Sequence, residues 1–365
     1  MAAHEGVPAR ERSAWSQRLL AAWGRQAWAS RPGPVAWLLV PLAWLYGLLV
    51  RMHRLGWRLR GATRAPVPLV VVGNLVAGGA GKTPVVIALA QALRARGWHP
   101  GVVSRGHGRD AGITRAVNAS DDARDVGDEP LLISRRTGLP VWVGRRRVDA
   151  ARALCTAHPE VDVLIADDGL QHRALAPDAA LVVFDSRGEG NGLLLPAGPL
   201  REPVPAQLPP HWEVLYTTDR ASTHLSGTHA TPRATDALPL AAWWRSDAAA
   251  ARPLAALRGQ RLLALAGIGS PQKFFATLRE AGLDFEPCPQ PDHARYDRLP
   301  WPPGTTVVLT TEKDAVKLPP ALADATAVWV VPLDLALPAA LVDALVARLS
   351  RSEGAPSPRP AAPTP

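Results

Sequence analysis

The amino-acid sequence predicts an α/β protein with two domains of mainly parallel sheet, the second smaller than the first, preceded by a long apolar helix. Three observations lead to this fold class. An uncharged apolar segment lies near the N-terminus, a glycine-rich loop joins an apolar strand to an apolar helix around residue 80, and apolar strands alternate with helices from residue 66 onward. Such alternation is typical of parallel sheets that helices cover on both faces.

Length and composition limit the class of protein. At 365 residues the chain exceeds what one hydrophobic core usually covers, so two domains are expected. Its two cysteines are too few and too far apart for a disulfide framework or a zinc site, which indicates a reducing compartment. The net charge of +9 comes almost wholly from arginine, because only four residues are lysine: Lys82, Lys273, Lys313 and Lys317. A lysine in so arginine-rich a chain is a candidate for a role that a planar guanidinium does not fill, and Lys82 fits this idea best.

The first element is an N-terminal helical segment, residues 1–64, that we expect to anchor the protein to a membrane. Pro34–Val50 contains 17 residues without a charge, and at about 1.5 Å per residue it is just long enough to cross a bilayer. Six of the 13 Trp lie in this segment, and Trp15, Leu19 and Trp23 share one helical face, as in an interfacial helix. This favours lipid over nucleic acid as the partner of a basic chain. The alternative is a buried helix of a soluble protein, and crossing versus lying in one leaflet stays open.

The next element is a strand, loop and helix between residues 69 and 93. Val70–Val72 reads as a buried strand, the glycine-rich loop follows, and Val85–Leu93 is apolar enough for a largely buried helix. Such a loop turns its backbone N–H groups and the helix N-terminus toward phosphates, while a lysine neutralises charge and a hydroxyl ligates Mg²⁺. The residues that we expect to bind a nucleoside triphosphate are Val76, Ala77, Gly78, Gly79, Ala80, Gly81, Lys82 and Thr83. The strict motif has glycine where Val76 stands, and an ordinary glycine-rich turn is the alternative.

Residues 65–205 are expected to form this P-loop-type nucleotide-binding α/β domain. Its predicted strands are Leu69–Val72, Gly101–Val103, Val141–Val143, Val161–Ala166 and Ala180–Phe184, and its predicted helices are Pro84–Arg96, Glu129–Arg135 and Arg146–Ala157. Residues 206–258 are rich in Pro, Ala and Thr and read as a linker with short strands at Trp212–Tyr216 and Leu240–Trp244.

Residues 259–350 repeat the alternation and are expected to form the smaller, C-terminal α/β domain. Its predicted strands are Leu262–Ala266, Thr306–Leu309 and Ala327–Val331, and its predicted helices are Pro271–Ala281 and Pro338–Leu349. Residues 351–365 form a tail rich in Pro, Ala and Ser with nothing to bury, and we expect it to be disordered.

Acidic residues follow one of the buried strands. Asp167 and Asp168 come directly after the strand at 161–166, at the sheet edge where the phosphate loop also lies, so they are placed to hold Mg²⁺. A turn with Asp as a helix cap is the alternative. Asp128 opens a helix-like segment and could equally be its N-cap, and His293 lies alone in a loop of the second domain.

Seven sequence blocks, in order, resemble the signature blocks of the tetraacyldisaccharide 4′-kinases, the bacterial lipid A 4′-kinases. They are GNLVAGGAGKTP (73–84), SRGHG (104–108), GDEP (127–130), DDGLQH (167–172), NGLLLPAGPLREP (191–203), PDHARY (291–296) and TEKDAVKL (311–318). Together they span most of the chain, and the apolar N-terminal helix matches as well. The loop of that family also lacks the early glycine. His107 stands where the family would have Tyr, and Ala294 replaces a frequent second His.

The resemblance implies a reaction and a location. The family transfers the γ-phosphate of ATP to the 4′-hydroxyl of tetraacyldisaccharide 1-phosphate, an acylated glucosamine disaccharide, and forms lipid IVA in lipid A biosynthesis. The enzymes act at the inner membrane with the active site facing the cytoplasm, and they need Mg²⁺. Their fold is implied to be two α/β domains joined by a small β linker, with the site in the cleft.

The resemblance also implies residue roles. Lys82 and Thr83 would hold the phosphates and Mg²⁺, and Asp167 and Asp168 would serve the metal and the nucleotide. Asp128 would be the general base, paired with His293. The substrate-binding residues of the same cleft would be Gln171, Arg147 and Arg201.

The rival interpretation is a P-loop GTPase or a metallochaperone-like nucleotide-binding protein at the membrane. GTPases read guanine with Asn/Thr-Lys-x-Asp, whereas Lys313 stands directly beside Asp314 in this chain, so the spacing fails. A nucleotide-driven membrane-targeting protein would explain the loop and the anchor but neither Asp128 nor His293.

Overall fold

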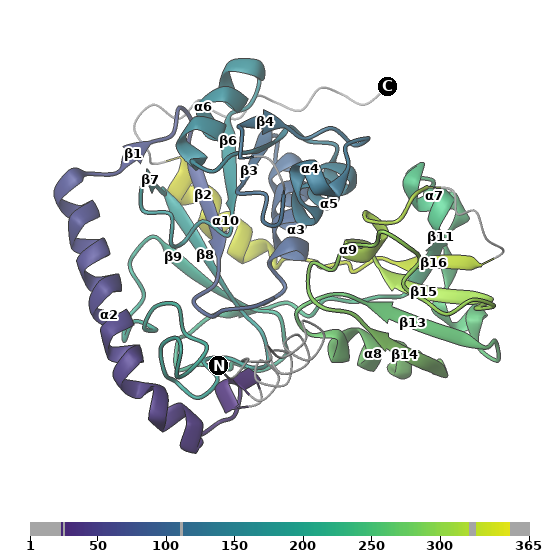
Figure 1. The fold of residues 1–365 in the computed structure, drawn as a ribbon. Helices are drawn as coiled ribbons and strands as arrows, with labels where there is room; N and C mark the ends of the chain where they lie inside the picture. Colours follow the sequence, from purple (N-terminus) through teal and green to yellow (C-terminus); the bar gives the residue numbers. More distant parts are fainter. Residues whose placement is uncertain (1–22, 25, 110–111, 321–325, 351–365) are drawn as a thin grey trace, which may run out of the picture.

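In a computed structural model, the protein is described at residues 23–24, 26–109, 112–320 and 326–350. These residues form a larger and a smaller β-sheet with helices around each, and one long helix runs along the outside of the larger part (Figure 1). The predicted helical face of Trp15 and Leu19 and the predicted disorder of residues 351–365 concern residues outside the described part of the chain.

The long helix is α2, Pro34–Arg60, which extends well beyond the uncharged run that predicted it. A narrow stripe of small residues, Ala36, Ala43 and Gly47, faces the protein, and only 17% of the most apolar 18-residue window is buried. The alternative of a buried helix in a soluble protein is therefore wrong. By length and composition α2 could cross a membrane. Its large exposed apolar side chains are Val35, Trp37, Leu38, Leu42, Trp44, Leu45, Leu48, Leu49, Met52, Leu55 and Leu59.

The larger sheet has eight strands in the order β10-β9-β8-β2-β6-β3-β5-β4, and every neighbouring pair is parallel except β4 and β5. The strands are β2 (Leu69–Gly73), β3 (Pro100–Ser104), β4 (Arg115–Ala116), β5 (Val141–Val143), β6 (Val163–Asp167), β8 (Ala179–Phe184), β9 (Trp212–Tyr216) and β10 (Thr228–His229). A separate short pair joins β1 (Thr63–Arg64) to β7 (Leu175–Ala176).

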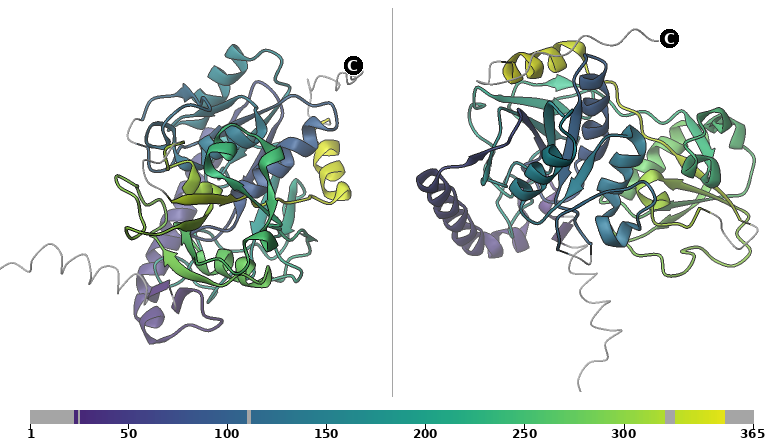
Figure 2. Two further views of the ribbon diagram at one scale, coloured as in Figure 1. Left: turned by 90° about the vertical axis from the view of Figure 1, so that its right-hand side faces the viewer. Right: turned by 90° about the horizontal axis from the view of Figure 1, so that it is seen from above.

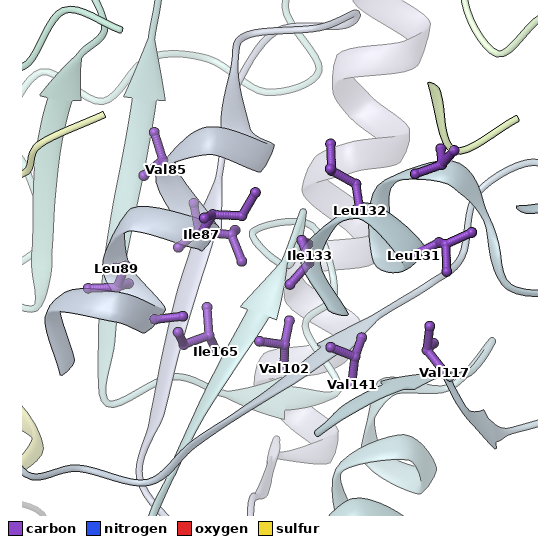
Figure 3. Packing of buried hydrophobic residues seen from close by; sticks show 14 of the residues in the cluster. Val85, Ile87, Leu89, Val102, Val117, Leu131, Leu132, Ile133, Val141 and Ile165 are labelled. Carbon is purple, nitrogen blue, oxygen red and sulfur yellow. The ribbon is translucent and has the colours of Figure 1, made fainter. Parts of the chain in front are cut away.

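Helices cover both faces of this sheet because its strands are apolar on both sides. Val70 and Val72 of β2 pack into one core cluster, and Val71, which points the other way, packs into another. On the first face lie α3 (Lys82–Arg94) and α5 (Asp128–Thr137), whose Ile87, Leu89 and Ile133 lie over Val102, Val141 and Ile165 (Figure 3). The second face is covered by α6 (Arg147–Ala157). The predicted helices and strands of this part are confirmed, with ends that differ by a few residues.

The smaller sheet has six strands in the order β12-β11-β16-β15-β13-β14. They are β11 (Asp236–Pro239), β12 (Arg252–Pro253), β13 (Leu262–Ala266), β14 (Phe285–Pro289), β15 (Val307–Thr311) and β16 (Ala327–Val331). Strands β13 to β16 are parallel, and β11 is antiparallel to both of its neighbours. The accompanying helices are α7 (Leu240–Trp244), α8 (Pro271–Glu280) and α9 (Glu312–Ala315), with two short 3₁₀ helices at Ala248–Ala250 and Leu254–Leu257. One further short helix, α4 (Ala123–Val126), belongs to the larger part and directly precedes α5.

Two sequence expectations need correction. Leu240–Trp244 is a helix, α7, rather than a strand: Pro239 ends β11, and the helix turns Leu240 and Trp243 into the core. Residues 206–258 are not one linker, because β9 and β10 extend the larger sheet while β11 and β12 belong to the smaller one. A strand as apolar as Trp212–Tyr216 gains most by pairing with the existing sheet, and β9 lies between β8 and β10.

The last helix also crosses the expected boundaries. α10 (Ala339–Leu349) packs against α3, β2 and β8 of the larger part, as the view from above in Figure 2 shows. The chain therefore leaves the larger sheet before β11 and returns after β16. The two passages pair with each other: the N–H of Arg233 donates to the C=O of Asp334 at 2.8 Å, and the reverse bond is 2.9 Å. How many parts fold independently stays a prediction.

Candidate active site

The glycine-rich loop connects β2 to α3. Gly78 and Gly81 adopt φ values of 89° and 74°, which residues other than glycine rarely adopt. Helix α3 begins directly after the loop, at Lys82. Nζ of Lys82 lies 3.1 Å from Oδ1 of Asn74 and 3.4 Å from Oδ1 of Asp168. The ammonium group is thus held at the mouth of the loop, where a phosphate would meet it.

The start of the loop is bound to the protein itself. The side chain of Val76 is buried with Ala80 and Leu200, which explains why an apolar residue occupies the place of the missing glycine. The N–H of Ala77 donates to the C=O of Pro199 at 2.7 Å. The N–H of Ala77 is therefore not available to a phosphate. This leaves Gly78–Thr83 as the part of the predicted nucleotide-binding loop whose backbone could contact phosphates.

Asp167 lies at the end of β6 and is 2% exposed. Its Oδ2 accepts a hydrogen bond from Oγ of Ser104 at 3.0 Å, while its buried Oδ1 has no hydrogen-bond partner among the described residues. Burial, followed by the negative charges of Glu129 and Asp168, raises the pKa of Asp167 to about 7. A carboxylate with an unpaired buried oxygen among other carboxylates fits a divalent cation, which would satisfy the oxygen and offset the repulsion.

Asp168 has the left-handed φ of 47° and turns its carboxylate toward the loop. Nη1 of Arg201 lies 3.1 Å from each of its two oxygens. Burial alone would raise the pKa of Asp168, but the charges of Lys82 and Arg201 outweigh burial and lower it. The described residues contain no group of three or more His, Cys, Asp or Glu side chains placed to hold a metal.

The three predicted substrate-binding residues line one cavity of about 580 Å³ together with Lys82 and Asp168. Each of the three also makes hydrogen bonds within the protein. Arg147 donates from Nη2 to the C=O of Asp167 (3.1 Å) and of Asp168 (2.8 Å), so it fixes the strand end. Gln171 donates to the C=O of Asn74 and accepts from Arg201. Contact of Arg147, Gln171 and Arg201 with a substrate stays a prediction.

The side chains of Asp128 and His293 are in contact, although Asp128 lies on a helix of the larger part and His293 in a loop of the smaller part. Asp128 is the first residue of α5, and Gly127 occupies the N-cap, so the N-cap reading of Asp128 is wrong. His293 lies in the loop after β14 with a φ of 57°, and its Nδ1 is 3.1 and 3.0 Å from Oδ1 and Oδ2 of Asp128. The ring of His107 packs against that of His293, with centroids 5.1 Å apart.

The pair is polarised by its surroundings. Burial would raise the pKa of Asp128, but the hydrogen bond from His293 and the charge of Lys313 lower it. The hydrogen bond to Asp128 raises the pKa of His293 against the opposing effect of burial. Because Asp128 and His293 are hydrogen-bonded to each other, the titration of each depends on the charge of the other.

Lys313 lies beside this pair; the sequence pointed to it through the scarcity of lysine and the block at 311–318, but without a role. Its Nζ is 3.1 Å from Glu129, 3.1 Å from Asp292 and 3.4 Å from Nε2 of His293. Burial lowers the pKa of Lys313, but Glu129, Asp128 and Asp292 outweigh burial and raise it. Glu129 and Asp292 lie in the blocks at 127–130 and 291–296, but no local pattern predicts their contact with Lys313, because that contact depends on how the two sheets are placed.

A cavity of about 580 Å³ joins these groups. Its walls come from the phosphate loop, the end of β6, the loop of His293 and α2. The lining residues are Tyr46, Gly78, Gly79, Lys82, Ser104, Arg105, His107, Glu129, Arg147, Asp167, Asp168, Gln171, His172, Leu195, Arg201, Asp292 and His293. Asp128 lines a smaller cavity of about 80 Å³, which His293 and His107 line as well. His293, which is hydrogen-bonded to Asp128, thus lines the same larger cavity as Gly78, Gly79 and Lys82 of the glycine-rich loop.

Ion pairs hold the two sheets together around the cavity. Nη1 of Arg136, from α5, lies 2.8 Å from both carboxylate oxygens of Glu312 in α9. Nζ of Lys273, from α8, lies 2.6 Å from Oδ2 of Asp185, which directly follows β8. The placement of the smaller sheet against the larger one is therefore supported by two separate ion-pair contacts.

Comparison with known proteins identifies the family of this chain. A family profile described as tetraacyldisaccharide-1-P 4′-kinase matches residues 35–350. A tetraacyldisaccharide 4′-kinase of Methylibium petroleiphilum is 55% identical over 347 residues, 92% of this chain and 96% of that protein. Another, from Leptothrix cholodnii, is 50% identical over 90% of this chain and 96% of its own.

The fold agrees as well. The crystal structure of the "apo" form of LpxK from Aquifex aeolicus in complex with ATP superposes with a TM-score of 0.69 at 24% identity, covering 86% of this chain and 99% of that one. The family profile spans both sheets and α2, and the relatives match over nearly their whole length. The chain belongs to the tetraacyldisaccharide-1-P 4′-kinase family.

Proposed function

We propose that this ATP-dependent kinase transfers the γ-phosphate of ATP to the 4′-hydroxyl of a tetraacyldisaccharide 1-phosphate, with Asp128 and His293 as the groups that take the hydroxyl proton. The product is lipid IVA, in lipid A biosynthesis. The observation that carries the assignment of the dyad is that His293, hydrogen-bonded to Asp128 at 3.0 Å, faces the cavity that also contains Lys82.

The phosphate loop binds the donor. The backbone N–H groups of Gly78–Thr83 and the N-terminus of α3 would attract the phosphates, and Lys82 would supply a point charge at their β- and γ-oxygens. Mg²⁺ bound by Thr83, Asp167 and Asp168 would neutralise the charge that develops on the transferred phosphate. Arg201 and Arg147 keep Asp168 and Asp167 in place for that purpose.

The dyad activates the acceptor. A sugar hydroxyl is a poor nucleophile, so its proton must leave as the bond to phosphorus forms. Asp128 is the general base: the hydroxyl proton moves to a carboxylate oxygen of Asp128 as the new bond to phosphorus forms and the bond between phosphorus and ADP breaks. His293 is its partner and orients that carboxylate through their hydrogen bond. Lys313 keeps the neighbouring Glu129 and Asp292 neutralised. Because the two halves of the dyad come from different sheets, catalysis requires the closed arrangement, which limits loss of ATP to water.

The rival GTPase function is not favoured. Asp314, which would have to read guanine, is fully buried, and its oxygens accept from the N–H of Gly267 at 2.9 Å and from the hydroxyl of Tyr296 at 2.7 Å. Glu312 is bound to Arg136. The TEKD segment is therefore part of the framework between the sheets.

We place the enzyme at the inner membrane with its site toward the cytoplasm. The outward side chains of α2 are apolar over most of its length, and its inward residue Tyr46 lines the catalytic cavity. An acylated acceptor would keep its chains in the bilayer beside α2 while its sugar enters the cavity. ATP is supplied from the cytoplasm, which sets the orientation.

One assay tests the function. Purified full-length protein is incubated with radiolabelled ATP, Mg²⁺ and tetraacyldisaccharide 1-phosphate in detergent micelles, and the lipid is separated by chromatography. We expect label in a disaccharide bisphosphate. Release of phosphate without labelled lipid would contradict the kinase assignment and favour a nucleotide-driven binding protein.

A further inference from the structure

The inner side of α2 is bound to the segment that carries Arg201. The hydroxyl of Tyr46 donates to the backbone C=O of Arg201 at 2.9 Å, and Arg54, two turns later, donates to the carboxylate of Glu202. Between them Gly47 allows close approach, because a Cβ there would lie 2.9 Å from Leu194. Since residues 47 and 54 are seven apart, they fall on one helical face.

The same segment is bound to the phosphate loop on its other side. The N–H of Arg201 donates to the C=O of Leu75 at 2.8 Å, and the C=O of Pro199 accepts from Ala77 at 2.7 Å. Segment 199–202 therefore lies between α2 and the start of the loop. From this position the guanidinium of Arg201 reaches both oxygens of Asp168.

Glu202 joins three elements. It is 4% exposed, and it accepts from Arg54 of α2 and also from Arg173, whose Nη2 lies 3.0 and 2.7 Å from its two oxygens. Arg173 belongs to the turn that follows Asp168. A buried carboxylate shared by two arginines is costly to disturb, because removing it leaves positive charge without a partner.

We propose that α2 is a positioning element for phosphoryl transfer as well as a membrane anchor. Tyr46 and Arg54 hold segment 199–202 where Arg201 meets Asp168, so the arrangement of the phosphate site depends on the seating of the membrane helix. The inference rests on the proposed kinase function. It assigns Tyr46, Arg54 and Glu202 as positioning residues that act through Arg201.

The test measures kinetics and membrane binding separately in full-length variants. Tyr46→Phe removes one hydrogen bond and should lower kcat roughly two- to tenfold. Glu202→Gln should lower kcat by roughly tenfold or more, because both arginines lose their carboxylate. The KM for ATP should change little, and sedimentation with phosphatidylethanolamine–phosphatidylglycerol vesicles should match wild type. Glu202→Asp should restore part of the activity.

The matched control is Arg51→Gln against Arg54→Gln. Both remove an arginine from the same helix, but Arg51 is exposed, so only Arg54→Gln should lower kcat. If Glu202 acts through Arg201, Glu202→Gln should have almost no further effect in an Arg201→Ala background.

Three results would overturn the inference. They are unchanged kcat in Tyr46→Phe and Glu202→Gln, losses from Glu202→Gln and Arg201→Ala that multiply, or a lower melting temperature with normal kcat per active site. Each leaves the kinase function standing. Wild-type protein that fails to phosphorylate the acceptor would overturn the kinase function and this inference together.

Discussion

Nδ1 of His293 lies 3.0 Å from Oδ2 of Asp128, although 165 positions separate the two residues in the chain. One follows a strand of the smaller sheet and the other opens a helix on the larger sheet. Their contact therefore reports how the two sheets are placed, and any group that fixes this placement affects the chemistry indirectly. Lys313 and Arg136 are such groups. Lys313, from the smaller part, pairs with Glu129 of the larger part, and Arg136, from the larger part, pairs with Glu312 of the smaller part.

The dyad predicts non-additive kinetics. Asp128→Asn and His293→Ala should each lower kcat by roughly a hundred- to ten-thousand-fold with a modest change in ATP affinity, because general-base help is lost. The double variant should be scarcely slower than the slower single variant, since residues that act as one unit are not additive. Steady-state kinetics with the lipid acceptor measure this, and losses that multiply would argue against the pair.

Lys82→Ala should abolish phosphoryl transfer while the fold stays intact, because the point charge on the β- and γ-phosphates is lost. Lys82→Arg is the matched control: it keeps the charge but replaces a compact ammonium with a planar group, so it should recover little activity. Turnover is measured alongside circular dichroism. Near-normal turnover of Lys82→Ala would show that the loop does not bind phosphate.

Lys313→Met should weaken the closed arrangement. The substitution keeps an apolar stem of similar length but removes the charge that neutralises Glu129, Asp292 and Asp128. Three carboxylates without a cation repel, so we expect a lower melting temperature and a lower kcat. Lys317→Met is the comparison, because Lys317 pairs with Asp314 inside the smaller part. Equal loss of kcat in the two variants would contradict a specific role for Lys313.

The outer face of α2 predicts membrane binding. Replacing Trp37, Leu38 and Trp44 with Ser should release the protein from vesicles, because each buried apolar side chain contributes about 1.5–3 kcal/mol. The three side chains are 62%, 79% and 74% exposed, so the substitutions should leave the fold unchanged. Deleting residues 1–60 should also release the protein, but it removes the contacts with Arg201 and Glu202 as well. Full sedimentation of the triple Ser variant would show that other surfaces bind lipid.

The dyad also predicts a pH-dependent contribution to stability. The pKa of His293 is raised above 6.5, so its contribution is fully present below pH 6.5 and is lost as pH rises through the folded value. The pKa of Asp128 is lowered from 3.8, so its contribution is present above pH 3.8 and is lost as pH falls through the folded value. The melting-temperature difference between wild type and His293→Ala should be largest below pH 6.5 and should shrink as pH rises through the folded pKa of His293. A difference that grows with pH would contradict this.

The sequence predicted the strands better than their partners. Val141–Val143, Leu262–Ala266 and Ala327–Val331 have the predicted bounds, because short apolar runs between turn residues leave little choice. The strand predicted at Leu240–Trp244 was wrong because a run of five apolar residues also fits a helix, and here Pro239 ends the preceding strand. Sheet membership of β9 depends on contacts far along the chain, which local patterns do not record.

In the site, too, residues that local patterns place were predicted, and residues that meet only across the two sheets were not. Lys82, Asp167 and Asp168 were predictable because the carboxyl ends of parallel strands meet at one edge. Glu129 and Asp292 were not, because they meet only through Lys313, across the two sheets. The scarcity of lysine was informative beyond Lys82: all four lysines contact carboxylates, namely Asp168, Asp185, Asp292 with Glu129, and Asp314.

The paired passages at Arg233 and Asp334 limit how the protein can open. Because the outgoing and returning chains are hydrogen-bonded to each other, they bend as one ribbon. Rotation of the smaller sheet across that ribbon needs small torsion changes in a few residues, whereas twisting or sliding would break both hydrogen bonds. Any movement of the smaller sheet that lets nucleotide in or product out would therefore be a rotation about one axis, across the paired passages. A proteolytic nick in either passage would leave the two parts attached but free to turn, and it would cost the enzyme the alignment of its dyad.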